Sequence, residues 1–307
     1  MKRLFTLLLA ALLLLSAVGC VSLSCTMPVR YTNAEKYTAG NFTYDEAKVK
    51  KVEVEWLGGS ITLKNGKGTL SVSEADSESL AEEDRMHWWI DGTTLKIKYC
   101  KSGKKLSLSK MEKKDLTLEL PAFVDLDLEV ASGKIVSESM LDLGRFRLEK
   151  ASGGTDIRFL SAKEVKIETA SGGVDLGEVS VSGEFEVDTA SGGLTVDEIA
   201  ADKIDVDSAS GGVAFGRVTA DRLDIDSASG SVSLGMLKAS TVRIKSTSGG
   251  VKIVLADRTA GAKIRFDAVS GSFNTALPAE SSGSVYTIGN GLMDVEISVV
   301  SGSVNVE

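Results

Sequence analysis

Apolar and polar residues alternate along much of the chain, in short runs that end at glycine. In residues 51–56, three apolar side chains alternate with charged ones, and Gly58 and Gly59 follow shortly after. Alternation with a period of two is typical of a β-strand with one buried face, and a glycine pair is typical of a turn. The pattern therefore predicts short strands joined by tight turns, and no apolar period of 3.6 residues indicates helices in the repeats.

From about residue 126 onward, a short phrase, usually Ala-Ser-Gly, returns at nearly constant spacing. The steps between successive phrase serines are 20, 19, 20, 19, 19, 19 and 22 residues, and the last step is 31. A fixed period near 20 residues is typical of solenoids, in which each coil buries its apolar face against its neighbours. The phrase serines are Ser132, Ser152, Ser171, Ser191, Ser210, Ser229, Ser248, Ser270 and Ser301.

Alignment on the phrase serine separates inward from outward positions. Apolar residues stand six and four positions before the serine in all nine units, as Phe185 and Val187 do before Ser191. A second apolar pair usually follows three and five positions after it, as Leu194 and Val196 do. The sequence thus predicts an all-β fold: a single-domain parallel β-solenoid (β-helix) of about nine to eleven coils, with an irregular N-terminal cap.

The glycine of each phrase is expected to form the corner between two strands. A sharp corner requires positive φ, which glycine adopts at low cost, so we expect a β-branched replacement to strain the coil. The phrase serines are not expected to act as nucleophiles, because no histidine lies in the repeats to activate one. The structural turn glycines are Gly133, Gly153, Gly172, Gly192, Gly211, Gly230, Gly249, Gly271 and Gly302.

The N-terminus is typical of an export signal. Lys2 and Arg3 precede an apolar run, residues 4–18, that is slightly short for a membrane span. Cys20 follows Ala-Val-Gly, a sequence that resembles the lipobox of bacterial lipoproteins, and it is the predicted lipidation site. Ordinary secretory cleavage at the same bond is the alternative, since Ala-Val-Gly also fits the small-residue rule for signal peptidases.

These segments give the expected organisation of the chain. A signal peptide occupies residues 1–19, and the lipidated cysteine with a tether occupies residues 20–41. Residues 42–120 form an N-terminal β cap and the first coils, and residues 121–307 form the β-solenoid of repeats about 19–20 residues long. The expected localisation is that of an exported, membrane-anchored lipoprotein of the bacterial cell envelope, with secretion as the alternative.

Cys25 and Cys100 remain after Cys20 is assigned to the lipid anchor. An oxidising compartment allows a disulfide between them, and two unpaired thiols, with Cys25 on the tether, are the alternative. His87 is the only histidine, so the sequence predicts no zinc cluster of cysteine and histidine.

The start of the repeat region carries a family resemblance. Residues 116–120 form a short apolar strand that ends at Pro121, and residues 126–135 lead into the recurring Ala-Ser-Gly-Gly-Val phrase. From about Lys48 to Glu307, the chain resembles the DUF4097 family of bacterial envelope proteins, which are named "putative adhesins". The resemblance implies export or membrane attachment and a single-domain β-solenoid, and it implies no catalytic motif. The word adhesin rests on an analogy of fold.

One outward column of the aligned repeats is almost entirely acidic. A carboxylate stands three residues before each of the first six phrase serines, and stacking would place these carboxylates one strand apart. Hard cations favour clustered carboxylates, so the column is a candidate ladder for a divalent cation such as Ca²⁺, or for a basic partner. A solvated face that keeps the rod soluble is the alternative. The ladder residues are Glu129, Glu149, Glu168, Asp188, Asp207 and Asp226.

Charge and composition narrow the function classes. The net charge is −8 and no basic stripe is visible, which argues against general attraction to nucleic acid. A polysaccharide-active β-helix enzyme would need a distinct pair of carboxylates, whereas the outward positions of the repeats are all similarly acidic. We therefore expect no enzyme and no cofactor other than Ca²⁺.

The expected function is surface contact. The sequence predicts a non-enzymatic cell-envelope protein that presents a β-solenoid surface for adhesion, or for contact with a protein or glycan. The alternative is an envelope-stress or signalling accessory that binds a membrane partner. Expected partners are the membrane, through the lipid anchor, and an envelope protein, host surface or glycan. Glu307 is expected to leave an open strand edge, which would permit end-to-end self-association.

Overall fold

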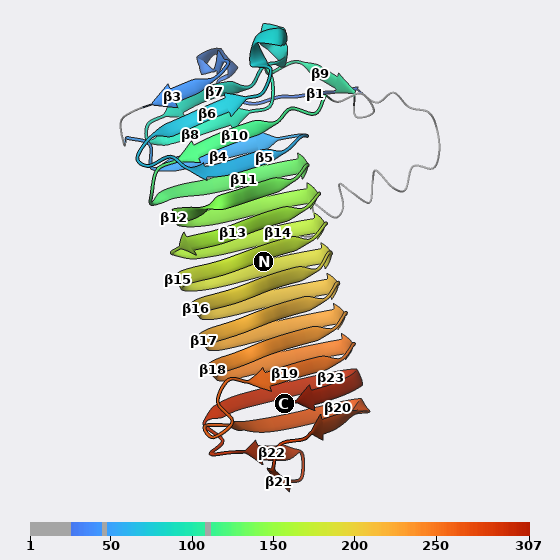
Figure 1. The fold of residues 1–307 in the computed structure, drawn as a ribbon. Coiled ribbons are helices and arrows are strands. Elements are labelled where there is room, and N and C mark those ends of the chain that lie inside the picture. The colour runs from blue at the N-terminus through green and yellow to red at the C-terminus, as the bar shows by residue number, and fades with distance from the viewer. Residues whose placement is uncertain (1–25, 45–47, 108–111) are drawn as a thin grey trace.

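The computed structural model describes residues 26–44, 48–107 and 112–307. The strands wind into one tall stack, with a cap at the N-terminal end and the repeat coils below it (Figure 1). Within these ranges the only helices are three short 3-10 helices of the cap, η1 (Ala34–Lys36), η2 (Ser77–Ser79) and η3 (Glu82–Asp84). The predicted all-β fold is confirmed.

The body of the stack is a parallel solenoid. Strands of neighbouring coils pair in register, so that Ser191 lies between Ser171 and Ser210. The Ala-Ser-Gly phrase therefore forms a straight column along the stack. The body consists of β11 (Val124–Ser132), β12 (Ile135–Ser152), β13 (Thr155–Ala162), β14 (Glu164–Ser171), β15 (Val174–Ser191), β16 (Leu194–Ser210), β17 (Val213–Ser229) and β18 (Val232–Ser248).

The apolar pairs on both sides of each corner point into the coils. Phe185, Val187 and Val196 are fully buried, and a continuous apolar core extends from the cap to the last coil. Phe266, at the C-terminal end of the stack, is only partly buried. Burial of apolar surface contributes roughly 25 cal/mol per Å², so each coil is stabilised mainly by the coils above and below it.

Close stacking is the main requirement for the corner glycines. A methyl group added to Gly192 would lie 2.2 Å from the carbonyl oxygen of Gly172, and each of the other eight corner glycines meets a neighbouring glycine carbonyl in the same way. No side chain fits at that distance. Positive φ, the reason expected from the sequence, is a second requirement only at Gly133, Gly153, Gly172, Gly230, Gly249 and Gly302.

The first coil of the chain lies inside the stack and not at its end. β4 (Lys51–Trp56) pairs in parallel with β8 (Thr94–Lys98) on one side and β11 on the other. β5 (Ile61–Asn65) likewise lies between β10 (Leu116–Leu120) and β12. The outer coil is thus formed by β8 and β10, although both come later in the sequence.

Antiparallel strands close the N-terminal end above this outer coil (Figure 1). β6 (Leu70–Glu74) pairs with β10, and β7 (His87–Asp91) pairs with β8. β3 (Phe42–Tyr44) adds to β6, and the last strand of the cap, β9 (Lys105–Ser107), pairs with β1.

Residues 26–41, expected to form a tether, contribute three elements to the cap. β1 (Thr26–Pro28) pairs with β9, η1 follows, and β2 (Thr38–Ala39) pairs with β7. The tyrosines of this segment pack on the cap: the Tyr31 hydroxyl donates a hydrogen bond to the carbonyl oxygen of Cys100 at 3.1 Å. The cap is therefore built from residues before 45 and from residues after 47.

The last strand of the chain also lies inside the stack. β23 (Met293–Val306) pairs with β18 and β19 (Val251–Leu255) on one side and with β20 (Ala262–Thr275) on the other. Glu307 exchanges backbone hydrogen bonds with Ile253 and Leu255. The predicted open edge at Glu307 is therefore wrong. β20 is the outermost strand of the coil, and β22 (Val285–Ile288) and β21 (Ala279–Ser282) continue from it as an antiparallel hairpin.

The predicted signal peptide, Cys20 and Cys25 lie outside the described residues. Thr26, which follows Cys25, pairs with Ser107. Cys100 is buried in the cap, and burial raises the pKa of its thiol to about 11. In the part of the chain that the structure describes, no helix is long and apolar enough to cross a membrane.

Candidate functional site: an acidic groove along the coils

The six predicted ladder residues form one continuous column. Each lies opposite the next in the parallel register, from Glu129 through to Asp226. Glu55 of β4 extends the column towards the cap, and Lys245 of β18 ends the acidic run. Neighbouring strands lie about 4.8 Å apart, so each inner carboxylate has a like charge on either side.

Four residues of this column, Glu168, Asp188, Asp207 and Asp226, line a long groove on the outside of the coils. The groove encloses about 1380 Å³ and extends from β12 to β20. Its lining comes from the positions five, three, two and one before the phrase serine, and small residues at the last position, such as Ala209 and Ala228, leave space beside the carboxylates. The charged lining consists of Glu168, Glu186, Asp188, Asp205, Asp207, Asp226 and Asp267, with Arg147, Lys166 and Lys245.

Ion pairs offset the negative charge near the cap-side end of the groove. The Lys166 ammonium lies 2.7 Å from Glu186, 3.1 Å from Glu168 and 3.8 Å from Asp188. Arg147 pairs with Glu149 on the same strand. Because these side chains remain accessible to water, each pair stabilises the fold by only about 1 kcal/mol or less, and their main effect is on the local potential.

The middle of the groove keeps negative charge that cations offset only in part: Lys203 lies 2.8 Å from Asp205, and Lys245 lies 3.5 Å from Asp226. Asp207 forms no ion pair with any residue in the described ranges. Its neighbours along the column are Asp188 and Asp226, and Asp205 lies two residues before it on the same strand. Burial, followed by the charges of Asp226 and Asp205, raises the pKa of Asp207.

Two more carboxylates of the column have raised pKa values. Burial raises the pKa of Asp188 to about 6; Lys166 opposes the rise, and Glu186 and Asp207 add to it. Burial, and then the neighbouring carboxylates, also raise the pKa of Glu129, which lies in the column but outside the groove lining. The ionised forms are disfavoured by burial and by like charge, so a cationic ligand in the groove would stabilise them.

The groove changes character at its C-terminal end. Beyond Asp226, the column continues with Lys245 and Ser298. The outermost lining position here is valine: Val300 is 48% exposed and Val269 is 83% exposed. An acidic section thus adjoins an apolar section, and the groove suits a partner that carries both cationic and apolar groups.

The carboxylates lie along a line and do not surround a point. Across residues 26–44, 48–107 and 112–307, no three Asp, Glu, His or Cys side chains converge in a way that could hold a metal ion. Ca²⁺ requires about six to eight oxygen ligands, whereas the column offers charge along a surface. Binding of Ca²⁺ remains a prediction from the sequence.

The only histidine is remote from the groove in the fold. His87 is buried in β7 of the cap, where its Nδ1 lies 2.9 Å from the carbonyl oxygen of Arg85, and burial lowers its pKa. The groove lining contains no histidine or cysteine. No described residue of the groove is therefore arranged as a nucleophile with an activating base.

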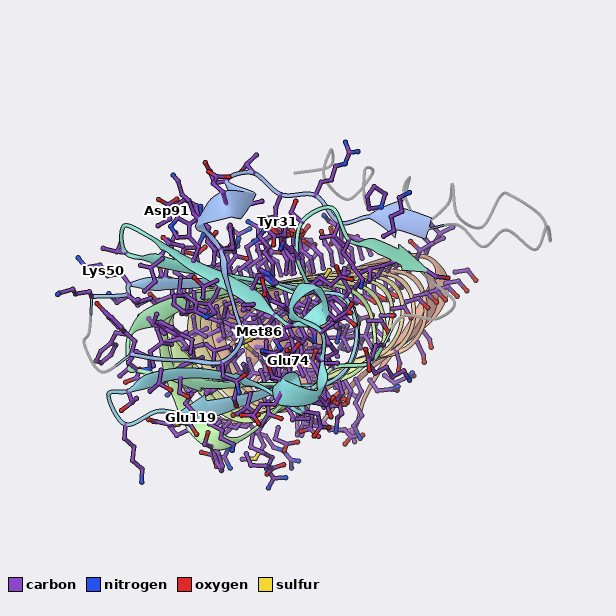
Figure 2. All side chains as sticks on the ribbon, turned by 90° about the horizontal axis from the view of Figure 1, so that it is seen from above. Tyr31, Lys50, Glu74, Met86, Asp91 and Glu119 are labelled. Atoms are coloured by element: carbon purple, nitrogen blue, oxygen red, sulfur yellow. The ribbon has the colours of Figure 1, made fainter. Side chains whose placement is uncertain are left out.

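Sequence reasoning missed a buried ion pair in the cap. The Lys114 ammonium lies 2.5 Å from Glu74 and donates a hydrogen bond to the carbonyl oxygen of Asp84 at 2.6 Å. Figure 2, which views the molecule from above, shows Glu74 beside Met86 near the middle of the cap, and the Met86 N–H donates to Glu74 at 3.0 Å. Lys114 belongs to a lysine-rich segment, so composition alone places it on the surface.

A second buried lysine lies inside the coils. Lys150 stands two residues before Ser152, is 1% exposed, and donates a hydrogen bond to the hydroxyl of Thr155. Burial lowers its pKa to about 8, and the distant charge of Asp175 only partly opposes this. The same alignment column holds buried Thr169 in the next coil, so the alignment contained the signal that Lys150 points inward.

Comparison with known proteins gives one family match and several similar folds. The profile of Toastrack DUF4097 matches residues 49–307. A "putative adhesin" from Parabacteroides distasonis ATCC 8503 is 11% identical, with 89% of this chain and 97% of that chain covered and a TM-score of 0.49. No curated protein matches the chain.

Two further solved structures are similar at the same level. A "putative adhesin" from Bacteroides fragilis NCTC 9343 is 11% identical, with 87% of this chain and 96% of that chain covered and a TM-score of 0.46. A "putative lipid binding protein" from Parabacteroides distasonis ATCC 8503 is 16% identical, with 88% and 97% covered and a TM-score of 0.46.

The family match covers both ends of the described solenoid. It begins at Val49, just before β4, and ends at Glu307, just after β23. It therefore includes the coil covered by the cap and the strand that returns into the stack. The resemblance inferred from the sequence, from about Lys48 to Glu307, is confirmed, and the chain belongs to the DUF4097 (Toastrack) family.

Proposed function

We propose that the protein is a non-enzymatic component of the bacterial cell envelope that binds a basic protein segment through the acidic groove. One observation carries the proposal: the carboxylates of Asp188, Asp207 and Asp226 lie side by side along the groove, and Asp207 at their centre forms no ion pair with any described residue. Lysine or arginine side chains of a partner would offset this charge and steer the encounter.

The lining of the groove favours a protein over a neutral glycan. It contains no Trp, Tyr or Phe side chain, and the amphipathic faces of aromatic rings are the usual contact for small ligands and sugars in such sites. Val269 and Val300 at its C-terminal end offer apolar contact instead. A partner segment with basic and aliphatic side chains in succession would match both sections.

The same proposal includes attachment of the cap end to a membrane. The apolar run before Cys20 supports export, and lipidation of Cys20 would supply the anchor. β1 begins six residues later, at Thr26, and an extended residue spans about 3.5 Å. The cap would then stand within roughly 20 Å of the membrane, with the groove running away from it. Mass spectrometry of the mature N-terminus, with Cys20→Ala as the control, tests the anchor.

A binding experiment with matched variants tests the groove. The probe is a synthetic peptide in which lysine alternates with valine, and affinity is measured by calorimetry at low and high salt. Asp207→Asn together with Asp226→Asn should weaken binding about tenfold and reduce its salt dependence. Asp197→Asn, an exposed residue of β16 outside the groove lining, is the control and should bind as the wild type does. Equal affinity in all three proteins would overturn the proposal.

A further inference from the structure

The two ends of the stack are closed differently. At the N-terminal end, the outer coil is covered because β10 pairs with β6 and β8 pairs with β7. At the C-terminal end, β20 pairs along its whole length with β23, but its outer edge meets β22 only from Ala262 to Arg265. One further bond, from the Phe266 N–H to the carbonyl oxygen of Ser284, ends that contact.

An unpaired edge therefore remains from Asp267 to Thr275. No strand within the described ranges pairs with the outer side of this segment. Proteins usually protect such edges with lysine, proline or a bulge, yet the segment contains no lysine and no proline, and Asp267 is its only charged residue. Its backbone donors and acceptors are available to another strand.

Apolar side chains accompany the free edge. The Phe273 ring stacks on Tyr286 with ring centroids 4.1 Å apart, and it contacts Phe266 at 5.8 Å. One coil further in, Ile297 and Val304, which pair with Phe266 and Phe273, are fully buried. The aromatic residues of β20 are thus core residues that lack a covering coil, so added burial there would be favourable.

The shape of the free edge selects its partner. The segment is centred on the corner at Gly271, with four residues on either side, so the edge is bent. A straight strand from another protein could pair with only one of the edge's two four-residue arms, 267–270 or 272–275. A second copy of this chain has the same bend, and a two-fold axis through the corner sets the arm before Gly271 of one copy antiparallel to the arm after Gly271 of the other. Such an isologous contact needs one self-complementary surface.

We propose that β20 pairs with β20 of a second copy and joins two solenoids end to end. The dimer needs no occupant in the groove, although Asp267 and Val269 belong to both the free edge and the groove lining. If the cap is also anchored as proposed above, the two anchors lie at opposite ends of the dimer, which would hold two membranes face to face. In that arrangement, the protein would adhere to a second copy of itself.

Sedimentation velocity over a range of concentrations tests the dimer. The wild type should show a reversible monomer–dimer equilibrium. The Phe266 N–H points to the outer edge, and donors alternate along a strand, so Ala268→Pro removes an outward donor and should weaken the dimer about tenfold. Val300→Lys, on the adjacent inner strand, should leave the equilibrium unchanged, which separates edge pairing from contact through the groove. A wild type that stays monomeric at every concentration would overturn the proposal and leave the groove proposal intact.

Engineered cysteines locate the contact. Ser272→Cys lies beside the proposed axis and should give a disulfide-linked dimer under mild oxidation. Ser303→Cys occupies the paired position on β23, one strand inside the stack, and should not. If both cysteine variants cross-linked equally well, the contact would lie on the side of the coils. That result would contradict pairing through the free edge of β20. Circular dichroism of each variant establishes that it is folded.

Discussion

Ser248 of β18 lies opposite Ser301 of β23, although Ser270 is the next phrase serine along the chain. Ser270 lies on the other side of β23, opposite the same Ser301. The chain therefore skips one coil position in the stack as it passes from β18 to β20. β23, which comes later in the sequence, fills that position. β4 and β5 are covered in the same way at the cap. The first and the last coil in the sequence are thus each held between two neighbours, whereas β20 forms the outer edge at the C-terminal end of the stack.

Loss of a core side chain from β23 should destabilise the C-terminal end. Ile297 is fully buried between β18 and β20, and Ile297→Ala should lower stability by about 3 kcal/mol, because it removes apolar contacts and leaves a cavity. Val300→Ala, on the same strand but 48% exposed, serves as the control and should cost less than about 1 kcal/mol. Thermal unfolding measures both. Equal small losses would mean that β23 does not lie inside the stack.

A single methyl group at a corner should be much more harmful than one at the next residue. Gly192 does not have positive φ, but an added Cβ would lie 2.2 Å from the carbonyl oxygen of Gly172. At Gly193 the nearest such atom, the carbonyl oxygen of Gly212, is 3.6 Å away. Gly192→Ala should therefore cost about 3 kcal/mol through overpacking, and Gly193→Ala about 1 kcal/mol or less. Thermal melts that coincide for the two variants would contradict the stacking argument.

The repeat pattern is sufficient to predict the body of the fold. It does not show the order in which the coils stack at the two ends. Inward and outward positions follow from the alignment on the phrase serine, whatever the order in which coils stack. Ser301 therefore satisfies the same pattern whether it follows Ser248 or Ser270. Only long-range pairing decides between the two orders, and a step of 31 residues before Ser301 contains no local signal for it.

The acidic column was predictable, but the groove was not. Glu129 to Asp226 share one alignment position, so stacking alone brings them together. The groove depends in addition on small side chains such as Ala209 beside the column and on which cations reach across neighbouring coils. Lys166 contacts carboxylates of both its own coil and the next, and sequence spacing cannot show such a contact.

Neutralising Asp188 should raise stability at neutral pH. Its pKa is raised from 3.8 to about 6, so between these values the folded state retains a proton that the unfolded state releases. Stability is therefore lost as the pH rises through this window. Asp188→Asn should melt at a higher temperature than the wild type at pH 7, and the difference should shrink towards pH 4. Asp197→Asn provides the control for a general charge effect. A lower melting temperature for Asp188→Asn at pH 7 would show that attraction to Lys166 outweighs burial.

Replacing the buried Lys150 should also stabilise the protein, with the opposite pH dependence. Burial lowers the pKa of Lys150 from 10.5 to about 8, so below pH 8 the folded state holds a buried ammonium without a carboxylate partner. The shift corresponds to about 3 kcal/mol, from which about 1 kcal/mol is subtracted because Lys150→Met leaves the Thr155 hydroxyl unpaired.

The net gain from Lys150→Met should thus be about 2 kcal/mol at pH 7. As the pH rises from 8 towards 10.5, the folded wild type loses the proton that its unfolded state keeps, so the wild type gains stability and the advantage of the variant disappears. Lys163→Met, an exposed lysine between β13 and β14, should show no such trend. Urea unfolding at pH 7 and pH 10 measures the difference. A destabilised Lys150→Met at pH 7 would mean that Lys150 is stabilised inside the coil by more than its bond to Thr155.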